Sequence, residues 1–343
     1  MTGLWTVIAA VAAFAVAAVL GIWLVPFLKK IHFGQTIREE GPSWHNSKQG
    51  TPIMGGFMFI IASIVAGVAC VLLYHAFGVA ELPLMNAKIF AGMFMAAAFG
   101  AIGFIDDYIK AVKKRNLGLT AWQKLILQFV VAIAYLVTIQ LFGGSTETFI
   151  PFYGMLDLGI LYYPLAAILI VGVVNAANLT DGIDGLDGSV TFFIAIFFML
   201  IASYVSRMGV SIMSAALAGG CLGFLVWNFH PAKVFMGDTG SLYLGGYVCA
   251  IAFALDMPIM LVLMGLVYIL EMFSVILQVL YFKATHGKRL FKMSPIHHHF
   301  EMSGWSEVKI VITFSIFAVI CGALSFIIVV YGNYRVPAFS IGA

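Results

Sequence analysis

Long apolar runs, separated by short polar segments, account for most of the 343-residue chain. Each run is close to the length that a helix needs to cross about 30 Å of hydrocarbon. The runs are continuous rather than alternating, which argues against a transmembrane β-barrel. The pattern predicts an all-α, polytopic membrane protein of about ten transmembrane helices. The expected spans are roughly residues 3–27, 53–74, 88–105, 121–141, 160–177, 189–206, 211–229, 240–256, 258–282 and 307–331.

The composition supports this class of protein. Hydrophobic residues make up 62% of the chain and charged residues 10%, and the mean hydropathy is +1.05. A soluble domain carries about 25% charged residues, so this chain could not cover a water-facing surface. The four cysteines lie inside apolar runs without metal or redox spacing, which predicts small, buried hydrophobic side chains.

Lysine and arginine are distributed unevenly between the two sides that these spans define. Of 18 such residues, 15 fall on one side, and the positive-inside rule assigns that side to the cytoplasm. Both termini are then expected outside. The longest outside connection mixes turn residues with short apolar pieces, which predicts a small hairpin. The expected cytoplasmic loops are residues 28–52, 106–122, 175–189, 229–241 and 283–306.

Six aspartates fall on the side assigned to the cytoplasm, although carboxylates near a membrane are costly unless they are partnered. A divalent cation or lysines from other loops are the candidate partners. Asp106 and Asp107 are adjacent and would diverge by about 100° on a helix. We therefore expect one to face a site and the other to hold a neighbouring helix or lysine, although a solvated helix end fits equally well. The remaining four are Asp181, Asp184, Asp187 and Asp238.

The segment "NAANLTDGIDGLDG", residues 175–188, combines three aspartates with three glycines. The glycines indicate a loop or frayed helix whose backbone can approach a ligand closely. The aspartate spacing lacks the ligand pattern and the final glutamate of a calcium-binding EF-hand loop. The segment is therefore either part of a polar site or a plain cytoplasmic turn.

The segment "VFMGDTGSLYLGG", residues 234–246, leads into an apolar helix. One interpretation is that Asp238 binds a metal while the glycines and the helix N-terminus meet phosphate. Magnesium suits such a site, because it takes one or two protein carboxylates and fills the remaining positions with water and substrate phosphate. The simpler interpretation is that Asp238 or Thr239 caps the helix.

Three further ionisable residues each have two interpretations. Lys48 and Lys124 lie at the mouths of spans, where they either bind phosphate as point charges or follow the positive-inside rule. Glu271 lies inside an apolar run, and an intramembrane carboxylate is a functional hypothesis by default. The alternative for Glu271 is a neutral or hydrogen-bonded structural role.

Three consecutive histidines, His297, His298 and His299, share the predicted cytoplasmic side with the aspartates. Consecutive side chains fan by about 100° on a helix and alternate on a strand, so these three are poorly placed to bind one ion together. We expect one or two of them to face the polar site as hydrogen-bond donors and the rest to hold the loop.

Four stretches together resemble the phospho-N-acetylmuramoyl-pentapeptide transferases, one branch of the polyprenyl-phosphate N-acetylhexosamine-1-phosphate transferase superfamily. They are "GFIDDYIK", "NAANLTDGIDGLDG", "VFMGDTGSLYLGG" and "SPIHHHFE". The histidine triplet and "GTPIMGG" point to the muramoyl-pentapeptide branch. The resemblance implies one integral-membrane transferase domain, residues 1–343, in the bacterial cell membrane with its active site on the cytoplasmic face. It is also compatible with a homodimer.

The resemblance implies a Mg²⁺-dependent reaction. Undecaprenyl phosphate attacks the β-phosphate of UDP-N-acetylmuramoyl-pentapeptide, and the products are UMP and lipid I of peptidoglycan synthesis. A phosphate monoester titrates near pH 6, at about the second pKa of phosphate, and is largely dianionic at neutral pH. Because a strong base is then unnecessary, direct displacement is favoured over an aspartyl-phosphate intermediate.

The resemblance also assigns roles to residues. Asp238 is the expected Mg²⁺ ligand, while Asp106 positions or deprotonates the lipid phosphate with support from Asp107. Catalytic roles are implied for Asp106, Asp107, Asp238 and His297. Substrate-binding roles are implied for Lys48, Lys124, Asn175, Asn178, Asp181, Gly182, Ile183, Asp184, Phe235, His298 and His299. Within this set, Gly182, Ile183 and Phe235 are the expected uracil pocket.

Two other functions compete with this one. A transferase for UDP-N-acetylglucosamine in the same superfamily would share the aspartates, and only a substrate comparison separates it cleanly. An ion-coupled transporter would place ionisable groups near the bilayer midplane, where Glu271 is the one good candidate in the sequence.

Overall fold

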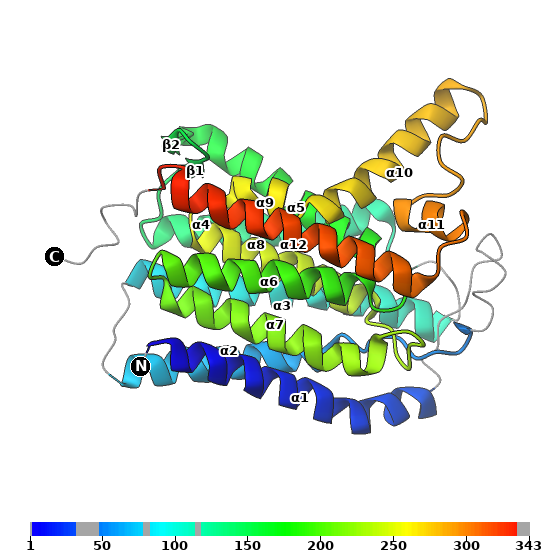
Figure 1. Cartoon of the computed structure of the whole chain (residues 1–343), viewed down its shortest axis with the longest axis horizontal. Coiled ribbons are helices and arrows are strands. Elements are labelled where there is room, and N and C mark those ends of the chain that lie inside the picture. Colours follow the sequence, from blue (N-terminus) through cyan, green and yellow to red (C-terminus); the bar gives the residue numbers. More distant parts are fainter. Residues whose placement is uncertain (1, 32–47, 78–82, 114–117, 335–343) are drawn as a thin grey trace.

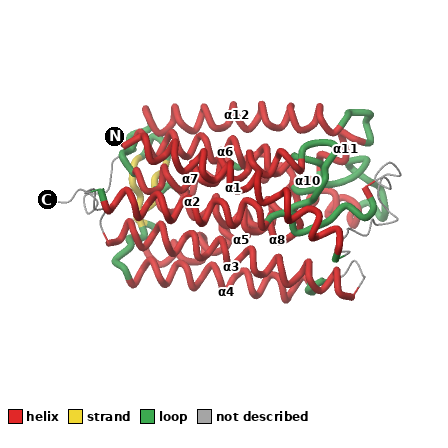
Figure 2. Tube along the Cα trace, turned by 90° about the horizontal axis from the view of Figure 1, so that it is seen from below, coloured by secondary structure: helices red, strands yellow, loops and turns green. Residues whose placement is uncertain are grey.

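The structure, a computed structural model, describes residues 2–31, 48–77, 83–113 and 118–334. The long helices lie alongside one another in a bundle, and α1 begins at the end of the bundle where α12 ends (Figure 1, Figure 2). In chain order the elements are α1 (Thr2–Lys30), α2 (Phe57–Ala76), α3 (Pro83–Lys113), α4 (Ala121–Leu141), β1 (Glu147–Ile150), β2 (Gly154–Asp157), η2 (Gly159–Leu161), α5 (Tyr162–Thr180), α6 (Leu186–Tyr204), α7 (Met208–Asn228), α8 (Gly237–Ala254), η3 (Pro258–Met260), α9 (Leu261–Met264), α10 (Leu266–Ala284), α11 (Ile296–Glu301) and α12 (Glu307–Tyr331).

Nine helices in the described part of the chain are long and apolar enough to cross a membrane, which confirms the polytopic all-α class. They are α1 to α7, α10 and α12. Large apolar side chains such as Trp23 and Val130 are exposed on the outer helices. Long helices are the expected solution in a membrane, because all their backbone polar groups are paired within the segment.

Helix α8 corresponds to the predicted span 240–256 and is not one of these nine. Every residue from Thr239 to Ala254 is buried, and the helix packs against α3 and α5. Its sequence contains four glycines, three alanines and two tyrosines. Small and polar residues suit helix–helix contacts inside a membrane protein, whereas lipid-facing helices need apolar side chains. Helix α8 is therefore an internal element of the bundle.

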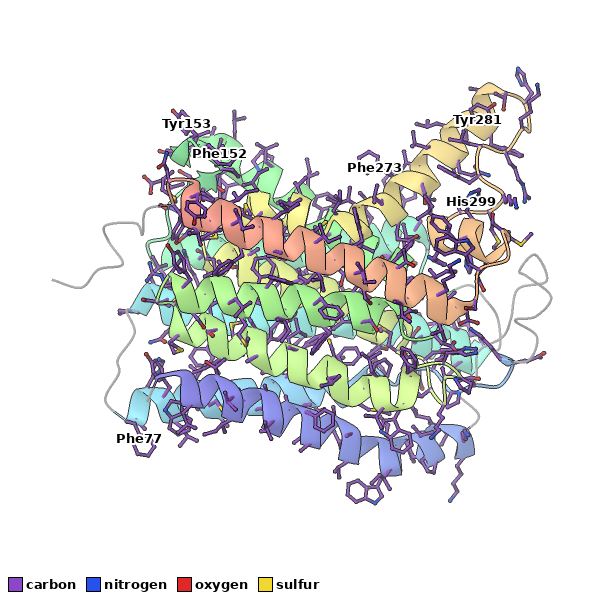
Figure 3. The ribbon with its side chains drawn as sticks, in the orientation of Figure 1. Phe77, Phe152, Tyr153, Phe273, Tyr281 and His299 are labelled. Carbon is purple, nitrogen blue, oxygen red and sulfur yellow. The ribbon has the colours of Figure 1, made fainter. Side chains whose placement is uncertain are left out.

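The prediction of one continuous span over residues 258–282 was wrong. The segment forms η3 and the single turn α9, and α10 restarts after Gly265. Figure 1 shows α10 leaning away from the rest of the bundle. Phe273 and Tyr281, which Figure 3 labels on this helix, are exposed. Apolar composition alone does not reveal such a break, because residues on both sides of it are apolar.

The end of the bundle where α12 ends carries a small β-hairpin, as predicted for the connection between α4 and α5 (Figure 1). Strands β1 and β2 are antiparallel, with Glu147 opposite Asp157 and Ile150 opposite Gly154. The Phe149 N–H also donates to the Asp256 carbonyl at 2.9 Å. This bond ties the hairpin to the turn that follows α8.

Two glycines let α2, α3 and α8 approach one another closely near the other end of the bundle. A Cβ on Gly56 would lie 2.5 Å from the Gly240 Cα, and a Cβ on Gly103 would lie 2.1 Å from the Asp238 carbonyl oxygen. Side chains cannot occupy such short distances, so both contacts require glycine. The close approach brings the last turns of α3 to the first turn of α8, where aspartates lie on both helices.

Candidate active site

Three carboxylates from two helices meet at the end of the bundle opposite the hairpin, the end that His299 marks in Figure 3. Asp106 and Asp107 belong to α3, and Asp238 belongs to the first turn of α8. One oxygen of each carboxylate lies within 4.8 Å of the other two. Because like charges at this distance repel, the cluster requires cations or hydrogen-bond donors to be stable.

Asp107 caps the N-terminus of α8. Its Oδ2 accepts hydrogen bonds from the Thr239 N–H at 2.9 Å and the Thr239 hydroxyl at 2.7 Å, and its Oδ1 accepts from the Asp238 N–H at 3.2 Å. The first N–H groups of a helix lack partners within the helix and carry partial positive charge, so a carboxylate is stabilised there. Gly237 has φ +71°, and a Cβ there would lie 2.5 Å from Asp107.

Asp238 contacts two ammonium groups. Its Oδ2 lies 3.0 Å from Lys110 Nζ and 2.9 Å from Lys124 Nζ. Its Oδ1 accepts a hydrogen bond from the Asn178 amide at 3.0 Å, and Lys124 also donates to Asn178 at 3.1 Å. Opposite charges at this range favour the ionised carboxylate. Three helices and the start of α8 thus converge on one aspartate.

Asp106 lies beside Asp238 and shares Lys110 with it. Its Oδ1 accepts from the Leu119 N–H at 2.7 Å, and its Oδ2 lies 2.5 Å from Lys110 Nζ. A Cβ on Gly118 would lie 2.4 Å from the same carboxylate, so the connection to α4 passes directly over it. Asp106 and Asp107 therefore diverge, one toward the lysine and the other toward a neighbouring helix.

The cluster fits a hard divalent cation such as Mg²⁺. Its donors are all carboxylate oxygens, which this ion prefers. Three carboxylates face two lysines, so the group carries a net negative charge when all three carboxylates are ionised. Asp107 uses both oxygens to cap α8, which leaves Asp238 and Asp106 as the residues best placed to hold a metal.

Asp181 lies in the turn between α5 and α6 and has no hydrogen bond or ion pair to any other described residue. Burial, followed by the nearby carboxylates of Asp187 and Asp238, raises the pKa of Asp181 well above its usual range. A cation bound beside it would favour the ionised form and release a proton. The sequence prediction that this segment has a cationic partner from another loop is confirmed for Asp184, which pairs with Lys48, whereas Asp181 meets no cation among the described residues.

A second charged cluster surrounds Lys48. Its Nζ lies 2.7 Å from Asp184 Oδ1 and 2.7 Å from Glu307 Oε2. His230 Nδ1 lies 3.0 Å from Asp184 Oδ2, and Glu307 also accepts from the Asp184 N–H at 3.1 Å. These contacts join the segment before α2, the Asp181–Gly185 turn, the segment after α7 and the first turn of α12.

Sequence reasoning missed Glu307 and His230. Glu307 begins α12 directly after the N-cap Ser306, a position where an acidic residue has an ordinary capping explanation. His230 precedes a proline in a loop. Neither residue belongs to a local sequence pattern that indicates a site. The one signal in the sequence was that both lie next to the cytoplasmic ends of predicted spans.

The three histidines have three different partners, as their spacing predicts. His297 Nδ1 lies 3.0 Å from Glu271 Oε2, and His298 Nδ1 lies 2.6 Å from Glu301 Oε2. His299 accepts a hydrogen bond from the Lys292 N–H at 3.1 Å. The rings are not arranged around one ion. His297 is completely buried, and its Nε2 lies against Gly182, where a Cβ would come within 2.1 Å.

The remaining predicted site residues lie at different depths. Asn175 exchanges hydrogen bonds with Gln128 of α4, at 2.7 and 3.3 Å, one turn deeper than Asn178. Ile183 is buried within the turn after Asp181. Phe235 lies between α7 and α8, where its N–H donates to the Pro52 carbonyl and its carbonyl accepts from the Gly55 N–H. Asp187 is buried and accepts from the Thr191 hydroxyl at 3.1 Å.

A membrane-embedded glycosyl transferase is the class that this bundle and its acidic end define. Residues 89–256, which include all of α4 to α8 and most of α3, match glycosyl transferase family 4. The matched segment contains the carboxylates of Asp106, Asp107 and Asp238, which we call the Asp238 cluster. It also contains the two lysines that contact Asp238, Lys110 and Lys124.

Comparison with individual proteins is more specific. The chain is 48% identical over 307 residues to the phospho-N-acetylmuramoyl-pentapeptide-transferase of Heliobacterium modesticaldum, covering 89% of this chain and 91% of that protein. It is 47% identical over 306 residues to the transferase of the same name from Halalkalibacterium halodurans, covering 88% and 90%. The corresponding protein of Clostridioides difficile is 44% identical over 325 residues, covering 93% and 96%. The chain belongs to the phospho-N-acetylmuramoyl-pentapeptide-transferase family, as its motifs predicted.

Replacing Gly182 by alanine should destabilise the protein, because the new Cβ would collide with the buried His297 ring. We expect a cost of about 1–3 kcal/mol, typical of overpacking. Thermal unfolding in detergent measures it. Gly172→Ala is the matched control, since a Cβ at that position meets nothing within 4 Å.

A double-mutant cycle locates the collision. In a His297→Ala background, Gly182→Ala should cost much less than in the wild type, because the ring is absent. Equal costs in the two backgrounds would contradict the proposed contact.

Proposed function

We propose that this chain transfers phospho-N-acetylmuramoyl-pentapeptide from UDP-N-acetylmuramoyl-pentapeptide to undecaprenyl phosphate, giving UMP and lipid I for peptidoglycan synthesis. The observation that carries the proposal is the Asp238 cluster, in which carboxylates and lysines meet at one end of an apolar bundle. One substrate is a water-soluble nucleotide and the other a membrane lipid. A site at the end of the bundle is accessible to both.

The basic residues support a cytoplasmic position for this end. Lys48, Lys110 and Lys124 lie in it, whereas Lys88 pairs with Asp256 near the hairpin end. By the positive-inside rule the richer end faces the cytoplasm, where UDP-linked precursors are available. Loops 28–52, 106–122, 175–189, 229–241 and 283–306 are then proposed as the cytoplasmic side of the active site. Residues 32–47 and 114–117 of the first two loops lie outside the described part of the chain.

Asp238 and Asp106 are the residues that would hold Mg²⁺. When bound, the ion neutralises diphosphate charge and makes the β-phosphorus more susceptible to attack. Lys110 and Lys124 contact Asp238 and are placed to bind phosphoryl oxygens as the substrate arrives. Asp107 keeps the N-terminus of α8, and with it Asp238, in a fixed position.

The reaction is proposed as a direct displacement. An oxygen of undecaprenyl phosphate forms a bond to the β-phosphorus, and the bond from that phosphorus to the oxygen of UMP breaks. Asp106, beside Lys110, orients the lipid phosphate for this attack. The phosphate is already dianionic at neutral pH, so no proton has to be removed by a strong base.

The nucleotide side of the site is proposed around the turn after α5. Asn178 bonds to Asp238, while Asp181 and Gly182 lie in the turn itself. Asp184 holds Lys48, which is placed to bind phosphate. Further nucleotide contacts are proposed for Asn175, Ile183, Phe235, His298 and His299. A flat apolar pocket from Ile183 and Phe235 would suit the uracil ring.

The decisive assay is UMP release by the purified protein with both substrates, with and without Mg²⁺. We expect release only when Mg²⁺, the muramoyl-pentapeptide nucleotide and the lipid phosphate are all present. Turnover of UDP-N-acetylglucosamine instead of the muramoyl nucleotide would favour the related hexosamine transferases. Absence of any Mg²⁺-dependent UMP would overturn the proposal.

Asp238→Asn should lower UMP release by at least about a hundredfold, because it removes the charge that binds the cation and orients the lysines. Thermal unfolding of the variant should show that it remains folded. Asp157→Asn, an exposed carboxylate at the hairpin end, is the control and should retain full activity. An Asp238→Asn protein with wild-type activity would remove this residue as the metal ligand.

Glu307→Gln should raise KM for the nucleotide about fivefold and change kcat little. The substitution keeps the volume but weakens a charged hydrogen bond to Lys48, and such a bond is worth about 1.5–3 kcal/mol against about 1 for a neutral one. Steady-state kinetics with the nucleotide as varied substrate measures the effect. Glu147→Gln on β1 is the control; an unchanged KM in Glu307→Gln would show that Lys48 does not depend on Glu307.

A further inference from the structure

Glu271 is a buried carboxylate that the proposed reaction does not use. Its side chain, in α10, is 0% exposed, and its Oε2 lies 3.0 Å from His297 Nδ1, which is also 0% exposed. Among the described residues, the side chain of His297 is its one polar side-chain partner. Glu271 Oε1 and His297 Nε2 are buried without a hydrogen-bond partner in this part of the chain.

The contact with Glu271 involves only Nδ1 of the ring, so Nε2 is the nitrogen left for another partner. A neutral imidazole carries its hydrogen on one of its two nitrogens. With a hydrogen at Nε2, the ring offers an N–H donor at this atom.

This donor is directed at the turn between α5 and α6. Nε2 lies directly against Gly182, so close that no side chain could stand at that position. Asp181, on the same turn, lies in the electrostatic field of Asp238 and Asp107. Nε2 of His297 thus contacts the turn that also carries Asp181, next to the cluster of Asp106, Asp107 and Asp238. A buried ring nitrogen without a partner requires an explanation, and a functional role is one of those that such groups have.

The neighbouring polar groups have partners of their own. Asp187 accepts from Thr191, whose hydroxyl also bonds to Tyr268. The ring of His298 lies 4.1 Å from that of His297, centroid to centroid, but its Nδ1 bonds to Glu301. The pair of Glu271 and His297 is therefore a separate unit that joins α10 to α11.

We propose that Glu271 is a positioning residue: it orients His297 so that Nε2–H, at the Gly182 turn, donates a hydrogen bond to a phosphoryl oxygen of the donor nucleotide. This inference rests on the proposed function. It requires the turn to shift when the nucleotide binds, because Nε2 is covered by Gly182 in the present structure. An intramembrane glutamate thereby acts on the nucleotide without touching it.

The primary test compares Glu271→Leu and Glu271→Gln with the wild type in the UMP-release assay. We expect Glu271→Leu to lower kcat/KM for the nucleotide about 10–100-fold, by analogy with the loss of the orienting partner of a metal-ligating histidine. Glu271→Gln should lose less, because its amide can still bond to Nδ1. KM for undecaprenyl phosphate should not change in either variant, whereas a general disturbance of the fold would affect both substrates.

A double-mutant cycle tests whether Glu271 acts through His297. In a His297→Ala background, Glu271→Leu should lower kcat/KM by less than about twofold, because the group that it orients is gone. An additional loss as large as in the wild-type background would overturn the proposal and leave Glu271 with a structural role only.

Ligand-dependent thermal unfolding gives a readout that needs no turnover. UDP should stabilise the wild type more than uridine does, and Glu271→Leu should reduce this difference while leaving the effect of uridine unchanged. An undiminished difference would contradict a bond to a phosphoryl oxygen.

Asp256→Asn is the matched control for breaking a buried ion pair. Asp256 pairs with Lys88 near the hairpin, so its loss should lower stability without changing the nucleotide KM or the UDP effect. If the wild type releases no UMP, the proposed reaction fails, and the UDP comparison still reports on His297. If the wild type is active and the Glu271 variants match it, only this inference fails.

Discussion

The cap that Asp107 places on α8 is the contact on which the rest of the site depends. One buried carboxylate of α3 accepts the Asp238 N–H, the Thr239 N–H and the Thr239 hydroxyl. It thereby joins two helices that are far apart in sequence and compensates the partial positive charge at the start of α8. Both oxygens of Asp107 are occupied by this task. In the proposed mechanism, the remaining carboxylates, Asp106 and Asp238, are left to meet cations and substrate.

Ion pairs lie on both sides of the Asp181 turn, and they would couple the binding of a cation to the binding of a phosphate. Asp238 is paired with two lysines, and Lys48 is paired with Asp184 and Glu307. In the proposed mechanism, a cation at Asp238 would compete with the lysines, and a phosphate on the lysines would remove them from Asp238. Each ligand would then favour the binding of the other, which is a positive coupling between cation and nucleotide.

The sequence predicted the class of fold, because apolar runs of this length are typical of membrane-spanning helices. It also predicted most of the polar residues that meet at the acidic end of the bundle, because Asp and Lys are rare in such a chain and gather at the ends of the spans. The divergence of Asp106 and Asp107 and the separation of the three histidines followed from helical spacing. The division of residues 258–282 did not, since Gly265 breaks a run without changing its composition. Glu307 could not be recognised either, because its role arises from contacts with Lys48 and Asp184 that lie far away in sequence.

Glycines determine how closely the functional side chains are held. Gly103 lies against the Asp238 carbonyl, Gly118 against the Asp106 carboxylate, Gly182 against the His297 ring and Gly237 against the Asp107 carboxylate. In each case a Cβ would come within 2.6 Å of the neighbouring group. The side chains are therefore held against backbone rather than against other flexible side chains. Because the backbone of the packed helices α3 and α8 moves little, the positions of the Asp107 and Asp238 carboxylates are set before any ligand arrives, which is the arrangement that electrostatic catalysis requires.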